Sequence, residues 1–68
     1  MKAVSGKEFA RLLERHGWEL KRIKGSQHVY MKAGNPARIS LPIHGNKPLK
    51  IGLWKHLMNL AGITEEEL

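Results

Sequence analysis

Two turn signals in the middle of the chain, Gly25-Ser26 and Gly34-Asn35-Pro36, constrain the fold more than any other feature. A two-residue Gly-Ser step is typical of a tight β-hairpin, and a Gly-Asn-Pro step is typical of a slightly longer connection. The segments that they separate are of ordinary strand length: Trp18–Lys24, Gln27–Lys32 and Ala37–Leu41. This spacing predicts a three-stranded antiparallel meander.

A helical pattern stands on each side of the meander. Ser5 and Glu8 have the spacing of a capping box at the start of a first helix, which we expect to end at Gly17. A second helix is expected from about Lys50 to Leu60, with one broad apolar arc made of Ile51, Leu53, Trp54, Leu57, Met58, Leu60 and Ala61. The predicted fold is therefore α+β in the order α-β-β-β-α, with both helices on one face of the sheet.

The alternation of side chains in the middle strand decides which residues face the helices. Val29 and Met31 alternate with His28, Tyr30 and Lys32. We expect Val29 and Met31 to face the helices, which leaves His28 and Lys32 on the open face. Tyr30 is also a good core residue, and its burial would reverse this assignment.

Length and composition exclude several classes of protein. The 68 residues form one domain, residues 1–68, in which the acidic residues 64–68 either cap one more short turn or fray. No apolar run approaches the roughly 20 residues of a membrane span, so no membrane association is expected. The chain has no cysteine, which fits a cytoplasmic location, and its four histidines lack the spacing of zinc ligands. We expect neither a metal nor another cofactor.

The charge balance indicates an anionic partner. Lys and Arg number 12 against 6 Asp and Glu, and three of those six are Glu65, Glu66 and Glu67. The remainder of the chain is therefore strongly basic, and this density favours a nucleic acid or an acidic protein as partner. Charge alone does not choose between them.

His28, separated from the Gly25-Ser26 turn by one residue, is the candidate catalytic residue. Histidine gives or takes a proton near neutral pH, and a basic surface gathers phosphates around it. Together these features suggest chemistry on RNA. A ribonuclease without a metal must deprotonate a ribose 2′-hydroxyl, stabilise the charge of the transition state and protonate the leaving 5′-oxygen. His28 suits the first or the last of these tasks.

Other residues near the turn are candidates for binding RNA. Tyr30 is a candidate for stacking on a base if it shares the open face with His28. His44 is an auxiliary candidate for proton donation, although a loop histidine that bonds its own turn is the simpler reading. The candidates for holding phosphate are Lys21, Arg22, Lys24 and Lys32, with the backbone amides of Gly25 and Ser26.

The element order resembles the double-stranded-RNA-binding-domain architecture, and the chain resembles the HicA (YcfA-like) toxins of bacterial and archaeal toxin–antitoxin pairs. The resemblance covers nearly the whole chain, from about Phe9 to Thr64. It is carried by short segments in a specific order, namely Gly17-Trp18, Lys24-Gly25-Ser26-Gln27-His28, Leu41-Pro42-Ile43-His44-Gly45-Asn46-Lys47, Leu49-Lys50-Ile51-Gly52-Leu53 and Leu60-Ala61-Gly62-Ile63-Thr64.

This resemblance implies an endoribonuclease that cleaves messenger RNA and is inhibited by a HicB-type antitoxin covering its active face. The catalytic histidine of the family's Gly-Ser-x-His turn corresponds to His28. Many members carry a second histidine at the x position, where this chain has Gln27. Two other functions stay open at this point: a non-catalytic RNA-binding module, and a basic adaptor domain that docks an acidic protein.

Overall fold

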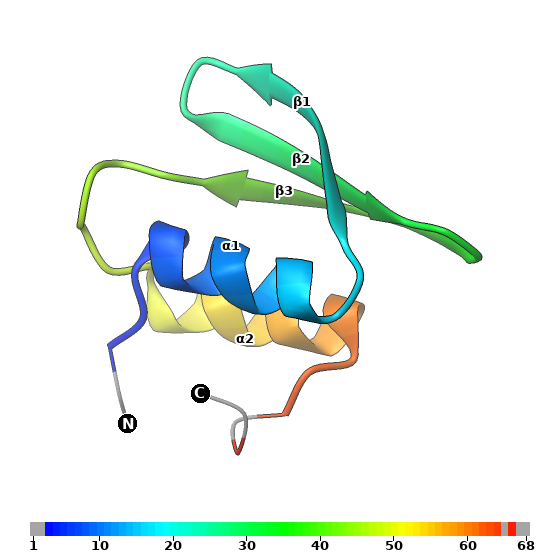
Figure 1. The fold of residues 1–68 in the computed structure, drawn as a ribbon. Helices are drawn as coiled ribbons and strands as arrows, with labels where there is room; N and C mark the ends of the chain where they lie inside the picture. The colour runs from blue at the N-terminus through cyan, green and yellow to red at the C-terminus, as the bar shows by residue number, and fades with distance from the viewer. Residues whose placement is uncertain (1–2, 65, 67–68) are drawn as a thin grey trace.

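The computed structural model, which describes residues 3–64 and 66, has five elements in the expected order. They are α1 (Gly6–Arg15), β1 (Glu19–Lys24), β2 (Gln27–Lys32), β3 (Asn35–Pro42) and α2 (Ile51–Ala61). The strands form one antiparallel sheet in the order β1-β2-β3, and both helices lie beneath the same face of it (Figure 1). The predicted α-β-β-β-α fold is confirmed. Of the acidic tail, Glu65, Glu67 and Leu68 lie outside the described residues.

The capping box predicted for α1 is present. The Ser5 hydroxyl oxygen accepts a hydrogen bond from the Glu8 backbone N–H at 3.2 Å, and the same hydroxyl donates to the Glu8 carboxylate, also at 3.2 Å. The helix ends at Arg15, and Gly17 follows with a φ of 87°, a backbone angle that favours glycine. A side-chain cap therefore sets the start of this helix, and the backbone freedom of a glycine sets its end.

The segment before α1 and the start of α1 lie against the loop that joins β3 to α2. The Leu49 N–H donates to the Val4 carbonyl at 2.7 Å. Gly6 is buried, and a Cβ atom there would lie 2.7 Å from the Pro42 carbonyl oxygen and 3.2 Å from the Ile43 Cα. The close approach of two backbones at Gly6 therefore positions the loop relative to the first helix.

The hydrophobic core lies between β2, β3 and the two helices, and β1 lies outside it. Ile39 and Leu41 of β3 are fully buried, and Tyr30 of β2 is 3% exposed. All six residues of β1 are exposed, including Leu20 and Ile23. The helices pack mainly beneath β3, so they leave the opposite edge of the sheet uncovered.

The side chains of the middle strand, β2, lie on the opposite faces of the sheet from those expected. Tyr30 pairs with Ile39 of β3 and is buried on the helix side, so His28 and Lys32 also lie on that side. Val29 and Met31 therefore lie on the opposite, open face. The expectation that Val29 and Met31 face the helices is wrong because the larger tyrosine ring fills the space above the two helices.

A β-bulge in β1 also changes which residues share a face. Leu20 pairs with Tyr30 and Arg22 pairs with Val29, so Lys21 is an extra residue in β1. Ile23 pairs with His28. Leu20 and Ile23 therefore share the helix-side face although they are three residues apart, whereas Arg22 lies on the open face.

The buried arc of α2 is narrower than predicted. Trp54, Leu57 and Met58 are buried, but Ile51 is 56% exposed and Leu60 is 38% exposed. The opposite side of α2, which consists of Gly52, Lys55, His56 and Asn59, is exposed. Among the described residues no helix is both long and apolar enough to cross a membrane.

Candidate active site

His28 is the second residue of β2 and lies next to the turn that joins β1 to β2. Its side chain is on the face of the sheet that the helices cover. Its neighbours across the sheet are Ile23 of β1 and Leu41 of β3. Leu41 is fully buried and Ile23 is 57% exposed, so His28 stands at the boundary between the core and the solvent. The side chain is accordingly only partly buried.

The turn that precedes His28 has a well-defined geometry. Gly25, its first residue, has a φ of 60°, as the first central position of a type II′ turn requires. Nothing lies within 4 Å of the position of a Cβ atom at Gly25. Glycine is thus required there for its backbone conformation rather than for space.

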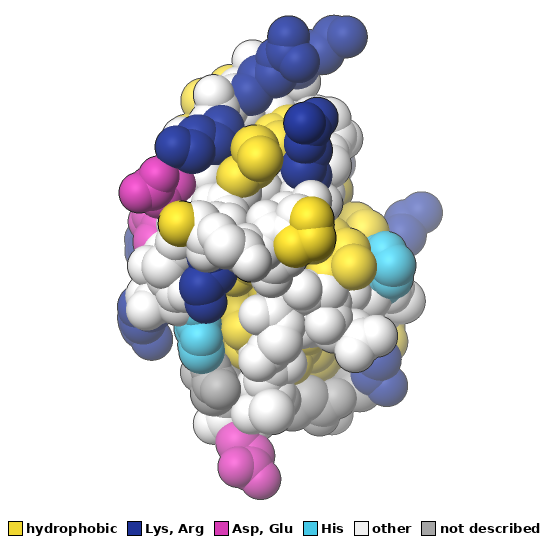
Figure 2. All heavy atoms as spheres, turned by 90° about the vertical axis from the view of Figure 1, so that its right-hand side faces the viewer, with side chains coloured by type: hydrophobic (Ala, Val, Ile, Leu, Met, Phe, Trp, Pro, Cys, Tyr) yellow, Lys and Arg dark blue, Asp and Glu magenta, His cyan; other side chains and the backbone are white. Residues whose placement is uncertain are grey.

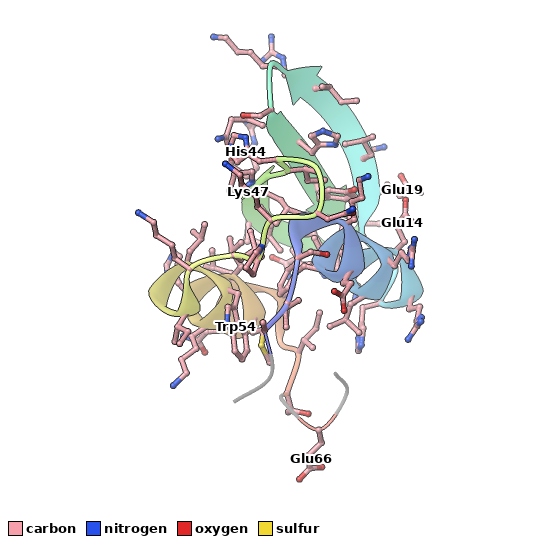
Figure 3. All side chains as sticks on the ribbon, turned by 90° about the vertical axis from the view of Figure 1, so that its left-hand side faces the viewer. Glu14, Glu19, His44, Lys47, Trp54 and Glu66 are labelled. Atoms are coloured by element: carbon pink, nitrogen blue, oxygen red, sulfur yellow. The ribbon has the colours of Figure 1, made fainter. Side chains whose placement is uncertain are left out.

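A second segment is attached to this turn. The Ile43 N–H donates to the Ser26 carbonyl at 2.9 Å, which ties the start of the β3–α2 loop to the hairpin. The loop then makes its own turn, in which the Lys47 N–H donates to the His44 carbonyl at 3.1 Å. Figure 3 shows this loop crossing in front of the sheet, with His44 and Lys47 close together on it. His44 is exposed, and it directly follows Ile43, the residue that is bonded to the turn.

The imidazole of His28 has no hydrogen-bond partner among the residues that the structure describes. A buried structural histidine would normally satisfy at least one ring nitrogen with such a bond. Both nitrogens are therefore available to a substrate. The described residues contain no group of three or more His, Cys, Asp or Glu side chains suited to a metal ion, so no set of ligands can be named from them.

The predicted phosphate-binding residues do not gather around His28. Arg22 and Lys24 pair with Val29 and Gln27, so they lie on the open face, opposite the imidazole. Lys21 is bonded to Glu19 at 2.8 Å. That hydrogen bond and the charge of Lys21 lower the pKa of the Glu19 carboxyl.

Lys32 does share the helix-side face with His28, but it lies four residues further along β2. At about 3.3 Å per residue that separation is about 13 Å. Its side chain lies toward the far end of α1, because its Cε atom would be 3.5 Å from a Cβ atom at Gly17. The structure thus distributes the expected cations over two faces and two ends of the sheet.

Tyr30 does not have the expected role of a base-stacking residue. Its ring is 3% exposed and forms part of the core. Burial raises the pKa of its hydroxyl, and the negative charge of Glu14 adds to the effect. The ring shares a face with His28, as the stacking role required, but that face is covered by the helices at Tyr30.

Two cations that the sequence analysis did not single out belong to the His28 end of the molecule. Lys47 lies on the loop that is tied to the Gly25-Ser26 turn. Lys7 follows Gly6, whose backbone packs against Pro42 and Ile43. Both are exposed. Lys47 could have been found from the sequence, because it lies in the segment His44-Gly45-Asn46-Lys47 together with a candidate histidine. Nothing in the sequence near Lys7 indicated that it lies close to the loop.

The fold and the site together define a small basic domain with the double-stranded-RNA-binding-domain architecture and a solvent-accessible histidine at the end of a β-hairpin. A family model described as the HicA toxin of bacterial toxin–antitoxin systems matches residues 6–63, which include all five elements, His28 and the loop with His44. The chain therefore belongs to the HicA toxin family. Among curated proteins, no match to the chain is found.

Proposed function

We propose that this chain is an endoribonuclease that cleaves messenger RNA without a metal ion, with His28 as the catalytic residue. The observation that carries the proposal is the environment of His28. Its imidazole is partly exposed, has no hydrogen-bond partner among the described residues and lies at the end of the sheet next to the β1–β2 turn. The family match supports the same reading, because the matched region contains the Gly-Ser-Gln-His turn.

The proposed reaction is an attack of the ribose 2′-oxygen on the adjacent phosphorus. The bond from the 2′-oxygen to phosphorus forms, the bond from phosphorus to the 5′-oxygen breaks, and the products carry a 2′,3′-cyclic phosphate and a 5′-hydroxyl. His28 accepts the proton of the 2′-hydroxyl or delivers a proton to the leaving 5′-oxygen. One imidazole does not readily do both in a single turnover, so a second group must complete the proton transfer.

The loop that is tied to the hairpin turn is the best source of that second group. His44 is exposed there and is a candidate proton donor, and Lys47 on the same loop is a candidate for stabilising the charged phosphate. A single acid–base group contributes about 10²–10⁴-fold to a rate, so we expect a slow enzyme.

RNA binding is proposed to involve both sides of the hairpin end. Lys7 and Lys47 belong to the side of His28, and Arg22 and Lys24 lie on the open face of the same hairpin. A phosphate backbone that passes around the Gly25-Ser26 turn would meet cations on either side. Binding of this kind depends on charge and weakens as salt increases.

We further propose that a HicB-type antitoxin inhibits the chain by covering this end of the sheet, in the cytoplasm. Because the same cations would contact RNA and an acidic partner, the antitoxin and the substrate would compete.

The test is cleavage of a defined RNA oligonucleotide by purified wild type, His28→Ala and His56→Ala. His56 is the matched control because it is an exposed histidine on α2, away from the hairpin. We expect His28→Ala to lose at least about 100-fold in rate and His56→Ala to match wild type. Cleavage should continue in EDTA and should stop when the cleaved nucleotide carries a 2′-deoxyribose.

Equal cleavage by wild type and His28→Ala would place the chemistry elsewhere, with His44 as the next residue to change. Tight RNA binding without cleavage by wild type would instead indicate a non-catalytic RNA-binding module.

A further inference from the structure

We propose that the free edge of β1 is a docking site for an extended acidic segment of a partner protein, which adds to the sheet as a fourth strand. The inference rests on the proposed function only for the identity of this partner as the antitoxin. Three observations support the docking site: the backbone edge of β1 is exposed, two apolar side chains are exposed on one face of β1, and cations lie on the other face.

The backbone of β1 is available for pairing. The strand order leaves β1 at the edge of the sheet, and each of its residues is exposed. The two-residue turn makes Lys24 and Gln27 the hydrogen-bonded closing pair of the hairpin. Because such pairs alternate along an antiparallel ladder, the N–H and C=O groups of Ile23 point away from β2 and into the open edge.

The side chains of β1 divide into two chemically different faces. Leu20 and Ile23 lie on the helix-side face and are 41% and 57% exposed. Arg22 and Lys24 lie on the open face. In the upper part of Figure 2, Lys and Arg side chains lie on either side of an exposed hydrophobic side chain. An added strand that matches both faces would alternate apolar residues with Asp or Glu.

Charge selects an acidic partner over a second copy of the chain. Cations on an edge strand disfavour its pairing with a second strand that also carries cations. Two copies joined through β1 would bring Arg22 and Lys24 of one copy close to those of the other, and each copy carries a net charge of +6. The same cations favour a strand that carries carboxylates.

Docking at this edge would restrict access to the candidate active site from the β1 side. Ile23 is the direct neighbour of His28 across the sheet, in a pair without backbone hydrogen bonds, where side chains lie closest. A strand added at about 4.8 Å from β1 would place an apolar side chain next to Ile23, about 9.6 Å from β2 and with Ile23 between it and the imidazole. The same strand would neutralise Arg22 and Lys24, which RNA is proposed to contact.

The probe for this inference is a seven-residue peptide, blocked at both ends, that alternates Glu and Val. We expect it to bind the full chain with an affinity that falls as salt rises, and to slow amide hydrogen exchange at Ile23. Two control peptides are an alternating Lys and Val peptide and a peptide of the same Glu and Val composition with the Glu residues in one block. Neither control should bind as tightly. The Lys and Val peptide carries positive instead of negative charge, and the block peptide lacks the alternation of Glu with Val.

The variants separate the backbone contribution from the side-chain contribution. Ile23→Pro removes the N–H that faces the open edge, whereas Ile23→Thr keeps it and also removes the apolar side chain. We expect Ile23→Pro to weaken peptide binding about tenfold relative to Ile23→Thr, through the loss of a ladder hydrogen bond and the obstruction by the ring. If Ile23→Pro does not fold, the double variant Arg22→Glu/Lys24→Glu serves instead and should abolish binding of the acidic peptide.

Equal affinity of Ile23→Pro and Ile23→Thr would overturn strand addition, and equal binding of the alternating Lys and Val peptide would overturn the acidic preference. Dimerisation of the free chain through β1 would show that a second copy is the occupant. Protection of the Ile23 amide by an RNA oligonucleotide but not by the peptide would assign the edge to RNA. The peptide is also measured on His28→Ala, where binding should be unchanged, so the docking site and the catalytic proposal can fail separately.

Discussion

Gly6 and Gly52 lie in the first turns of α1 and α2, and replacing each by alanine should change stability in opposite directions. A Cβ atom at Gly6 would lie 2.7 Å from the Pro42 carbonyl oxygen, 3.0 Å from the Ile43 Cγ1 and 3.2 Å from the Ile43 Cα. Two of these three atoms belong to the backbone, which cannot move away from a new Cβ atom as easily as a flexible side chain can. At Gly52 nothing lies within 4 Å, and neither glycine has a positive φ.

The magnitudes follow from these contacts. Alanine in place of glycine gains about 0.5 kcal/mol in the first turn of a helix, so Gly52→Ala should be that much more stable than wild type. Overpacking in a close contact costs about 1–3 kcal/mol, so Gly6→Ala should lose about 0.5–2.5 kcal/mol after the same gain is counted. For a domain of this size each kcal/mol shifts the melting temperature by about 4–8 °C.

The assay is urea and thermal unfolding of the three proteins, followed by circular dichroism. Gly6→Ala should also cleave RNA more slowly under conditions where it is fully folded, because Pro42 and Ile43 begin the segment that leads to His44. A Gly6→Ala chain as stable as Gly52→Ala would refute the close approach of α1 to this loop. It would also remove the argument that α1 positions the loop beside the hairpin.

Three further predictions concern the turn, the core and the titration of a buried ring. Gly25→Ala should cost about 1–2 kcal/mol of unfolding free energy, because its φ of 60° is unfavourable for alanine, and urea unfolding measures this. Leu57→Ala should cost about 2–5 kcal/mol because Leu57 is 3% exposed, whereas Ile51→Ala should change the thermal midpoint little because Ile51 is 56% exposed. Burial, reinforced by Glu14, raises the pKa of Tyr30 above its ordinary value of 10.0. The unfolded chain therefore loses that proton first, and wild type should lose stability as pH rises above about 10. The Tyr30→Phe chain should lose less over the same range, and equal losses in urea midpoints between pH 8 and 11 would contradict the burial of the hydroxyl.

Much of the architecture could be predicted because it depends on local backbone chemistry. The Ser5–Glu8 capping box, the end of α1 before Gly17 and the Gly25-Ser26 turn each act within a few residues. The family likewise depends on short segments in a fixed order, and the match over residues 6–63 confirms that resemblance. The choice of His28 as candidate catalytic residue rests on the same local pattern and stays a prediction.

The facing of the strands could not be predicted from the same kind of signal. Alternation divides β2 into two sets of side chains but does not say which set is buried. Packing against the helices decides this, and it buries Tyr30 while Val29 and Met31 lie on the open face. His28 lies on the helix side as a consequence.

The sequence by itself thus determined the elements, their order, the basic character of the chain and its family, because capping, turn geometry and composition need no distant contact. Only the tertiary structure decided the environment of His28. The bulge at Lys21 brings Leu20 onto the same face of β1 as Ile23, which is the cross-strand neighbour of His28. The bond from Ile43 to Ser26 brings the loop of His44 to the turn. The helix-side placement of His28 and the attachment of this loop depend on contacts between segments far apart in the chain, which no local pattern encodes.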